Sequence, residues 1–280
     1  MLIFTLSNVL EVYFFCKGYI VPEVVVKVLL SIFSFYMDTS LNKYISDTGF
    51  CSRRMADKYI EEGRVTLNGR MAKKGNRVTE KDTVLIDAEP LKRKPVPVYI
   101  MLNKPKGITC TTDLKDPANI INFIHYKSRI FPIGRLDKLS EGLIFLTNDG
   151  DIVNKILRAG NRHEKEYVVT TDKPVTKDFV HKMSHGIRLL GTVTKNCFVR
   201  QEGEKRFTII LTEGLNRQIR RMCAALDYKV TSLKRVRIMH ITLQGLAPGK
   251  WRHFTKDEIE TINKMVLHSS KTADSEGMGE

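Results

Sequence analysis

One aspartate lies where a carboxylate could take part in a reaction. Asp137 follows Arg135 by two residues and comes just before residues 142–147, an apolar run with the pattern of a buried strand. A carboxylate held at such a point could serve as a nucleophile or as a general base. It could equally form a structural Asx turn, in which the side chain bonds to nearby backbone. These residues alone leave both interpretations open.

Two further places carry side chains that are suited to a ligand. Tyr167 lies in a strand-like segment, where a tyrosine can pack in the core or present its ring to a ligand. A predicted helix over 216–226 begins with three arginines, which are Arg217, Arg220 and Arg221. Arg217 shares a face of this helix with one of the other two, and such clusters typically bind phosphate groups. The arginines therefore predict an anionic partner, whereas the tyrosine stays ambiguous.

The overall charge also favours a polyanionic partner. The chain has 280 residues, with 46 Lys+Arg against 31 Asp+Glu, which gives a net charge of +15. This excess is typical of proteins that bind RNA or DNA, ahead of anionic membrane surfaces. The five cysteines form no C-x-x-C pair, so neither a zinc site nor a disulfide framework is predicted. The histidines are interpreted as core or surface residues, and no metal site is predicted.

Residues 1–36 differ from the rest of the chain. They are apolar and β-branched, but they are interrupted by Glu11, Lys17, Pro22, Glu23 and Lys27. The longest charge-free runs are far shorter than the roughly 18–20 residues that span a bilayer. Two interpretations remain, an extension upstream of a true start at Met37 or a peripheral apolar anchor.

The first folded unit is predicted over 41–89. Leu41, Tyr44 and Ile45 have helical spacing, and Ser52 is suited to cap a second helix. Asn68-Gly69 predicts a hairpin turn, and residues 83–86 a later strand. The basic residues that crowd this unit are Lys43, Arg53, Arg54, Lys58, Arg64, Arg70, Lys73 and Lys74. Such clustering on a small module predicts contact with the RNA backbone.

A larger unit is predicted over 98–266, after a charged, proline-containing linker over 90–97. The predicted strands are 99–103, 142–147, 166–170, 207–211 and 238–243. The predicted helices are 151–157, 176–184, 216–226 and 256–266. Strands and helices do not alternate regularly, so the pattern indicates an α+β fold with a mixed, largely antiparallel sheet. The polar residues 267–280 are expected to be a disordered tail.

Together these segments resemble the RsuA/RluB/RluF-type pseudouridine synthases over residues 41–266. The resemblance rests on an S4-type RNA-binding module at 41–89 and on five motifs. These are LNKPKG at 102–107, PIGRLDKLSEGLIFLTNDGD at 132–151, KEY at 165–167, GLNRQIRRMC at 214–223 and RVRIMHITL at 235–243. Within the family, NKILRAGNRHEKEY at 154–167 and GTVTK at 191–195 are most similar to the F-type large-subunit ribosomal RNA enzymes.

The resemblance implies roles for individual residues. Asp137 would be the catalytic residue and Arg220 alone would face it. Tyr167 would stack on a flipped-out uracil, and Arg135 would fill the gap in the RNA or hold the adjacent phosphate. Ile219 and Leu143 would form an apolar floor. The remaining RNA-binding residues would be Arg217, Arg221, Arg53, Arg54, Lys58, Arg64, Lys73 and Lys74.

The implied reaction is the isomerisation of a uridine in structured RNA, which needs no cofactor and no metal. The implied substrate is 23S ribosomal RNA, with 16S ribosomal RNA or a tRNA anticodon loop as alternatives. A cytoplasmic monomer without stable membrane association is expected. Two other classes remain open, a non-catalytic S4-type RNA-binding or ribosome assembly protein, and a membrane-peripheral scaffold anchored by residues 1–36.

Overall fold

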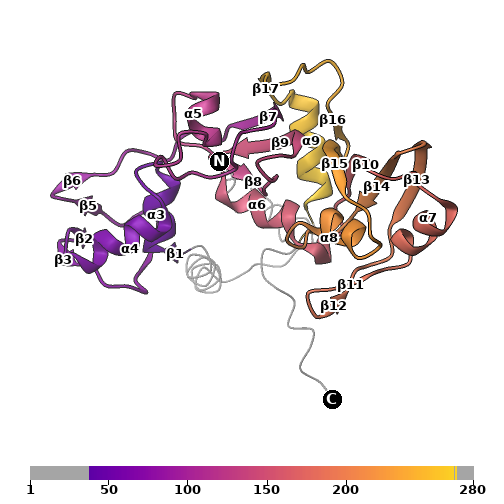
Figure 1. Cartoon of the computed structure of the whole chain (residues 1–280). Coiled ribbons are helices and arrows are strands. Elements are labelled where there is room, and N and C mark those ends of the chain that lie inside the picture. Colours follow the sequence, from indigo (N-terminus) through magenta and orange to yellow (C-terminus); the bar gives the residue numbers. More distant parts are fainter. Residues whose placement is uncertain (1–37, 268, 270–280) are drawn as a thin grey trace, which may run out of the picture. The chain divides into compact units, whose positions relative to one another are not determined.

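The computed structural model describes residues 38–267 and 269, and the chain divides into two compact units after Pro95 (Figure 1). The division falls inside the stretch that the sequence pattern predicts to be a linker. The predicted extension over 1–36 lies outside the described residues, as does nearly all of the predicted tail over 267–280.

The N-terminal unit consists of two helices and short strands. The helices are α3 (Leu41–Asp47) and α4 (Arg53–Glu61). One sheet has the order β3-β2-β5-β6, formed by β3 (Arg70–Met71), β2 (Val65–Leu67), β5 (Val84–Ile86) and β6 (Glu89–Pro90). A second pairs β1 (Thr39–Ser40) with β4 (Arg77–Val78). Both predicted helices and the predicted hairpin are confirmed.

Local sequence signals account for the ends of these elements. The Ser52 side chain accepts a hydrogen bond from the Met55 amide, which caps α4 as predicted. Asn68 and Gly69 both have positive φ, 51° and 75°, as the tight turn between β2 and β3 requires. Pro90, predicted as linker, instead belongs to the edge strand β6, where a missing N–H is tolerated.

The C-terminal unit is built on one large sheet with the order β13-β14-β10-β15-β9-β7-β17. Its strands are β7 (Tyr99–Lys104), β9 (Glu141–Thr147), β10 (Lys165–Thr171), β13 (Phe198–Gly203), β14 (Arg206–Leu211), β15 (Val230–Ile238) and β17 (Trp251–His253). Two short strands pair beside this path, β8 (Phe131–Ile133) on β9 and β16 (Ile241–Thr242) on β15. The β9–β15 pair is parallel and the other pairs are antiparallel, so the predicted fold class is confirmed.

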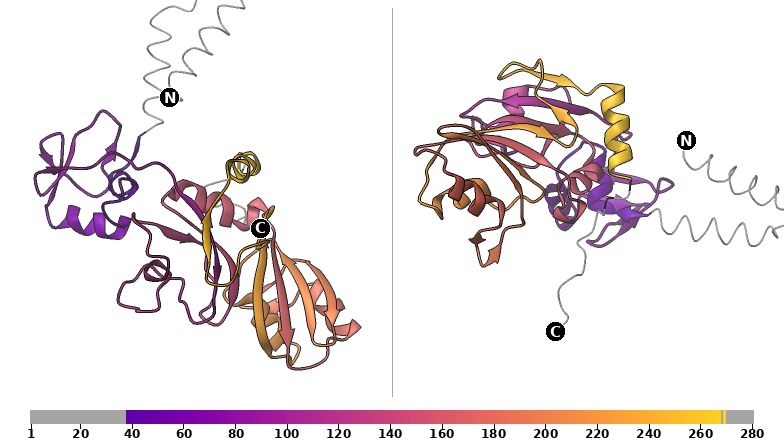
Figure 2. Two further views of the ribbon diagram at one scale, coloured as in Figure 1. Left: turned by 90° about the horizontal axis from the view of Figure 1, so that it is seen from above. Right: turned by 90° about the vertical axis from the view of Figure 1, so that its right-hand side faces the viewer.

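Helices cover both faces of this sheet. They are α5 (Ile120–Ile124), α6 (Gly150–Leu157), α7 (Lys177–Ser184), α8 (Gln218–Ala224) and α9 (Lys256–Met265). Helices α6 and α9, the latter drawn in yellow, lie on one face of the sheet (Figure 2). Helices α5, α7 and α8 pack on the other face, in two apolar clusters that both include Tyr167. This face, called the α5/α8 face below, carries the polar site residues.

One strand was placed wrongly by the sequence pattern. The prediction put a strand at 238–243, but the long strand is β15 (Val230–Ile238), and only β16 follows it. Three charged side chains in β15 hide its pattern, because Lys234, Arg235 and Arg237 interrupt the apolar positions. Arg235 and Arg237 nevertheless fit the sheet, since Arg235 bonds to a backbone carbonyl and Arg237 pairs with Glu166.

Among the described residues, no helix is both long enough and apolar enough to cross a bilayer.

Candidate active site

Asp137 lies in the loop that joins β8 to β9. The amide of Ser140 donates a hydrogen bond to the Asp137 carbonyl at 3.0 Å, which closes a turn after the aspartate. The preceding residue, Leu136, is buried in the apolar cluster that also contains Tyr167, and its amide donates to Cys110 Sγ at 3.4 Å. The Asp137 carboxylate itself is 31% exposed. The turn and the buried leucine therefore fix the backbone while the carboxylate stays accessible.

Arg220, on α8, is held beside this carboxylate by fixed partners. Its Nη1 donates to the Val230 carbonyl and its Nη2 to Ser140 Oγ, each at 3.2 Å. Its Nε lies 3.4 Å from Asp137 Oδ2 and makes no hydrogen bond to any residue that the structure describes. The guanidinium, 16% exposed, thus supplies a positive charge in a set position without closing a tight hydrogen bond on the aspartate.

Arg217 also reaches Asp137, so the prediction that Arg220 alone faces the aspartate is wrong. Arg217 Nη1 lies 3.4 Å from the same Oδ2 atom, and its side chain is 51% exposed. The helix was expected to begin at Asn216 but begins at Gln218, which leaves Arg217 before it in the left-handed conformation with φ 51°. That conformation takes Arg217 off the helix surface on which the prediction had placed it.

Arg221, the third arginine, points to a different partner. Its Nε and Nη2 donate to the carbonyl and side-chain oxygen of Asn216 at 3.0 and 3.2 Å. Among the described contacts, the Asp137 Oδ2 atom has two arginine neighbours, whereas Oδ1 accepts no hydrogen bond. One carboxylate oxygen is therefore free to meet a substrate.

A glycine brings the Asp137 loop close to the strand beside Tyr167. Gly142, the second residue of β9, has φ +107°, and a Cβ on it would lie 2.2 Å from the Arg235 carbonyl oxygen. Gly142 pairs with Arg235 in the parallel β9–β15 contact. Arg235 in turn pairs with Tyr167 of the neighbouring strand β10. This close crossing places the loop that carries Asp137 on the same part of the sheet as Tyr167.

Tyr167 lies between the two apolar clusters of the α5/α8 face and is half-buried. Ile219, on α8, belongs to one of these clusters, as the predicted apolar floor requires. Leu143 does not. It packs with Met101 and the α6 and α9 side chains on the opposite face of the sheet, so its prediction as floor is wrong. Successive side chains of a strand point to opposite faces of its sheet, so a difference of one residue along β9 changes the face on which a side chain lies.

Lys104 is a buried cation beside the Asp137 loop, and the sequence analysis did not single it out. Its ammonium donates to the carbonyls of Pro105 at 2.9 Å and Ile108 at 2.8 Å, and lies 3.5 Å from the Lys138 carbonyl. Burial lowers its pKa, an effect that Asp137 opposes. A lysine at the end of the apolar run 99–104 was the signal available in the sequence.

Two further buried cations lie near Tyr167 and were also missed. Arg235 donates from Nε to the Leu143 carbonyl at 2.7 Å, and its guanidinium carbon lies 6.0 Å from the centre of the Tyr167 ring. Its Nη2 is buried without a hydrogen-bond partner in the part of the chain that the structure describes. Burial, and then the charge of Arg235, lower the pKa of Lys165 to about 8. These cations make the site strongly positive.

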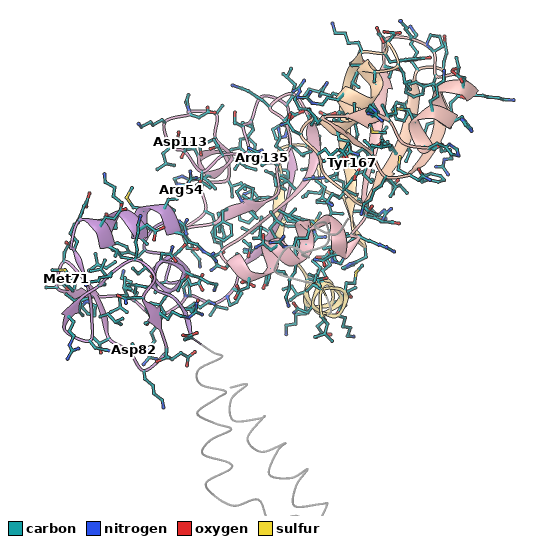
Figure 3. All side chains as sticks on the ribbon, turned by 90° about the horizontal axis from the view of Figure 1, so that it is seen from below. Arg54, Met71, Asp82, Asp113, Arg135 and Tyr167 are labelled. Carbon is teal, nitrogen blue, oxygen red and sulfur yellow. The ribbon has the colours of Figure 1, made fainter. Side chains whose placement is uncertain are left out.

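Arg135 is exposed, two residues before Asp137. Figure 3 labels it together with Tyr167 in the C-terminal unit. Across residues 38–267, no hydrogen bond or ion pair of its side chain is found.

In the N-terminal unit, carboxylates separate the predicted RNA contacts into two groups. Lys58 pairs with Glu62 at 3.6 Å, Arg64 with Asp87 at 2.5 Å, and Lys74 with Glu61. No side-chain ion pair or hydrogen bond is found, among the residues described, for Arg53, Arg54, Arg70 and Lys73. A cation without a carboxylate partner is the better phosphate ligand, because nothing has to be displaced from it.

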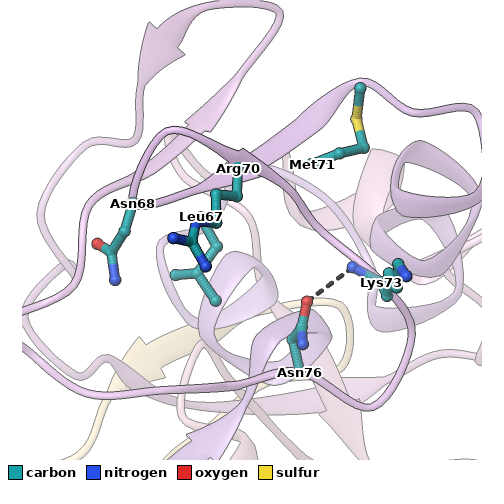
Figure 4. A pocket seen from close by; sticks show the side chains of 6 residues that line it. All are labelled: Leu67, Asn68, Arg70, Met71, Lys73 and Asn76. Atoms are coloured by element: carbon teal, nitrogen blue, oxygen red, sulfur yellow. Dashed lines mark hydrogen bonds between the residues drawn. The ribbon is translucent and has the colours of Figure 1, made fainter.

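Two of these unpaired cations line a pocket at the β2–β3 hairpin (Figure 4). Its volume is about 490 Å³, and its lining residues are Leu67, Asn68, Arg70, Met71, Lys73 and Asn76. The backbone amide of Lys73 donates a hydrogen bond to Asn76 Oδ1 at 2.7 Å, which links two of the lining residues. Figure 3 shows Arg54 and Met71 at different ends of the unit, so the unpaired cations form two separate positive areas.

His181, on α7, and His185, the residue after that helix, have the spacing of metal ligands, which the sequence analysis overlooked, but their rings stack at 4.1 Å between centres. Within the described residues there is no group of three or more His, Cys, Asp or Glu side chains that could hold an ion.

Known proteins share both units of this chain. Residues 98–225 match the RNA pseudouridylate synthase family, and residues 39–84 match the S4 domain. The dual-specificity RNA pseudouridine synthase RluF of Escherichia coli K12 is 53% identical over 232 residues, which cover 82% of this chain and 80% of that protein. Ribosomal large subunit pseudouridine synthase B of Bacillus subtilis is 35% identical and covers 81% of this chain and 97% of its own length.

A solved structure of a pseudouridylate synthase agrees with these relatives. It is 29% identical to this chain, with a TM-score of 0.59, and the match covers 80% of this chain and 99% of that one. Asp137, Tyr167 and Arg220 all lie within the region that matches the synthase family. The chain therefore belongs to the RNA pseudouridine synthases of the RsuA/RluB/RluF type and is an RNA isomerase.

Proposed function

We propose that this isomerase converts a flipped-out uridine of large-subunit (23S) ribosomal RNA to pseudouridine, with Asp137 as the catalytic residue. The observation that carries the proposal is the state of the Asp137 carboxylate. Its Oδ2 faces two arginines at 3.4 Å, while its Oδ1 has no partner among the described residues. A charged, oriented and accessible carboxylate is what attack on a sugar requires.

The chemistry is an internal rearrangement. The N1–C1′ bond breaks and its electron pair goes to the uracil ring, the ring turns over, and C5 bonds to C1′. The C5 proton leaves and N1 gains a proton, so the product has the same atoms and oxidation state as the substrate. The balance requires neither a redox cofactor nor a metal. Two roles fit Asp137, addition to C1′ or removal of the C2′ proton.

The neighbouring side chains have separate tasks in this proposal. Arg220 places a positive charge beside the carboxylate and orients it, because its own position is set by Val230 and Ser140. Tyr167 stacks on the detached base, and its hydroxyl lies on the side from which the C5 proton is taken. Arg135, exposed and unpaired among the described residues, fills the gap that the flipped uridine leaves or holds the next phosphate.

Substrate binding uses the cations that no carboxylate neutralises. Arg53, Arg54 and Lys73 were predicted as RNA contacts and have no partner among the described residues, and Arg70 joins them. Arg217 and Arg221 extend the positive surface beside Asp137. Lys58, Arg64 and Lys74 contribute less, since their charges are already paired.

The names of the relatives support the choice of substrate. One relative is a ribosomal large subunit enzyme and another has dual specificity, which supports 23S ribosomal RNA first and a second RNA, such as a tRNA anticodon loop, next. We further propose that the protein works as a monomer in the cytoplasm, where ribosomal RNA is found.

The test is to map pseudouridine across total RNA from a deletion strain that carries either the wild-type gene or Asp137→Asn. The substitution keeps the size of the side chain and removes its charge. The proposal is supported if one pseudouridine of the large-subunit RNA is present with the wild-type gene and absent with Asp137→Asn. Restoration of that site by Asp137→Asn would refute the role of the carboxylate, and restored growth without any modified uridine would favour a non-catalytic RNA-binding protein.

A further inference from the structure

An aromatic cluster at the edge of the large sheet has no role in the site described so far. Trp251, the chain's single tryptophan, begins the edge strand β17. Its ring centre lies 5.9 Å from that of Tyr126 and 5.7 Å from that of His253, both edge-on. Tyr126 and His253 contact each other at 5.7 Å. Trp251 is nevertheless 36% exposed.

The register of β17 places this cluster on the α5/α8 face. Trp251 pairs with Leu102, and His253 pairs with Ile100 on β7. Directly opposed side chains point to the same face of a sheet. Leu102 and Ile100 belong to the apolar cluster that contains Leu136, the residue before Asp137. Trp251 therefore lies on the same face as the catalytic site, at the outer edge of the sheet.

A second exposed ring lies nearby. Phe123, on α5, is 37% exposed, and a Cβ built on Gly249 would come within 3.7 Å of its ring. Gly249 thus leaves room for the ring two residues before Trp251. Exposed apolar rings gathered in one region of a surface are typical of ligand-binding areas.

The charges around these rings are positive and largely free. Lys250 precedes Trp251 and Lys127 follows Tyr126, and both are exposed, with no side-chain ion pair or hydrogen bond found for either across the described chain. Arg252 differs, because Glu258 pairs with it at 2.7 Å. The indole N–H of Trp251 likewise donates to no described residue. Exposed aromatic faces beside free cations are typical of surfaces that bind unpaired nucleotides.

We propose that Trp251 and Phe123, with Lys127 and Lys250, bind unpaired nucleotides of the substrate RNA outside the catalytic pocket. A base stacks on the exposed indole and the lysines contact the flanking phosphates. The surface lies on the same face as Asp137, so one strand of RNA reaches both. The inference rests on the proposed function, because the RNA is the substrate of that reaction.

The single tryptophan gives a direct readout, because a base stacked on an indole quenches its fluorescence. The full chain is titrated with a short single-stranded oligouridine and, separately, with a fully paired RNA duplex. Saturable quenching by the single strand, and much weaker quenching by the duplex, is expected. The signal reports only the surroundings of Trp251 and is independent of catalysis.

Substitutions then test whether the contact contributes to binding. Trp251→Ala is expected to weaken oligouridine binding about 5-fold to 100-fold, and Trp251→Phe to retain most of it. Lys127→Ala with Lys250→Ala should lower the salt slope of binding by roughly 0.7 per phosphate neutralised by these lysines. Phe198→Ala is the matched control, since Phe198 is an exposed aromatic residue on the distant edge strand β13.

The outcomes separate this inference from the proposed function. Oligouridine could leave the fluorescence unchanged although the protein binds ribosomal RNA and converts its uridine. The proposed binding surface at Trp251 would then be wrong, and the assignment of the reaction would stand. Equal weakening of binding by Trp251→Ala and Phe198→Ala would also overturn it. If uridine is not converted but the quenching and the Trp251→Ala defect persist, the RNA surface stands and the assignment of the reaction fails.

Discussion

At the scale of single residues, the site is a carboxylate surrounded by excess positive charge. Asp137 has Arg217 and Arg220 at 3.4 Å, and the buried Lys104 is close enough for their charges to interact. The two arginines are not equivalent, because Arg220 has fixed partners and is largely buried, whereas Arg217 is half exposed. Water weakens an exposed ion pair far more than a sheltered one.

The three arginines should therefore differ in a single-turnover experiment at saturating enzyme. Arg220→Met is expected to lower the rate of isomerisation by about 100-fold or more, because it removes an oriented charge from the site. Arg217→Met should lower the rate by roughly 10-fold or less and also weaken RNA binding. Arg221→Met, which removes only hydrogen bonds to Asn216, should affect binding alone. Equal rates for all three variants would contradict the geometry.

The buried Lys165 leads to a prediction on stability. Its pKa is lowered from 10.5 to about 8, first by burial and then by Arg235. Between these two values the unfolded chain binds the proton and the folded chain does not, so the free energy of unfolding rises with pH over that window. Below pH 8 the folded protein carries a buried charge that costs on the order of 3 kcal/mol.

Replacing this lysine with methionine should reveal that cost. Lys165→Met is expected to raise the urea midpoint at pH 7, because methionine fills similar space without a charge. The difference from the wild type should shrink as the pH rises from 8 toward 10. Lys173→Met, at an exposed lysine, is the control and should show no such pH dependence. A difference that grows with pH would refute the assignment.

At the scale of elements, the close crossing of β9 and β15 positions the site. Asp137 precedes β9, Arg220 contacts the first residue of β15, and Tyr167 lies on the next strand, β10. The crossing exists because Gly142 has no side chain, since a Cβ there would lie 2.2 Å from the Arg235 carbonyl oxygen. This carbonyl belongs to the backbone of β15, which cannot move aside as a flexible side chain could.

Gly142→Ala should consequently damage both fold and activity. Its φ of +107° disfavours any side chain, and the clash adds to the strain, so the free energy of unfolding is expected to fall by about 3 kcal/mol or more. Trp251 lies in the same unit and reports its unfolding in urea. Gly245→Ala is the control, because Gly245 also has positive φ but open space around it. Similar midpoints for both variants would show that the crossing tolerates a methyl group.

At the scale of the entire chain, the cations behind the net charge of +15 do not all attract RNA equally. Carboxylates within the N-terminal unit neutralise Lys58, Arg64 and Lys74, so these residues add little attraction for RNA. Four cations of this unit that are unpaired among the described residues lie in two areas, Arg53 and Arg54 at the start of α4, and Arg70 and Lys73 at the hairpin pocket (Figure 4). The long-range attraction of a polyanion depends on the net charge. The salt dependence of binding, in contrast, depends on the number of phosphates that the protein contacts, because those phosphates release their counterions.

Two double variants separate these effects. Arg70→Ala with Lys73→Ala should weaken RNA binding and lower its salt slope by roughly 0.7–0.9 per phosphate that these side chains neutralise. Lys58→Ala with Lys74→Ala removes the same charge but should change the slope less, because each lysine is already paired. Dissociation constants over a range of salt concentrations provide the test. Identical slopes for the two variants would mean that only net charge matters.

Local structure and the candidate chemistry could be predicted from neighbouring residues along the chain. Ser52 caps its helix as predicted, and the Asn68-Gly69 turn forms where two residues with positive φ are needed. Such features depend on neighbours within about four residues, so the sequence is enough to predict them. The motifs around Asp137 and Arg220 likewise indicate the family, because each is a short run of adjacent residues.

Which side chains meet, in contrast, depends on how distant segments pack in the folded protein. Arg217 joins Asp137 because it takes a left-handed conformation before α8, and Leu143 faces the far side of the sheet. Lys165 is a buried cation only because β10 lies between two other strands, and Trp251 faces the catalytic side only through its register with β7. These outcomes depend on partners far away in the chain, and no local pattern carries that information.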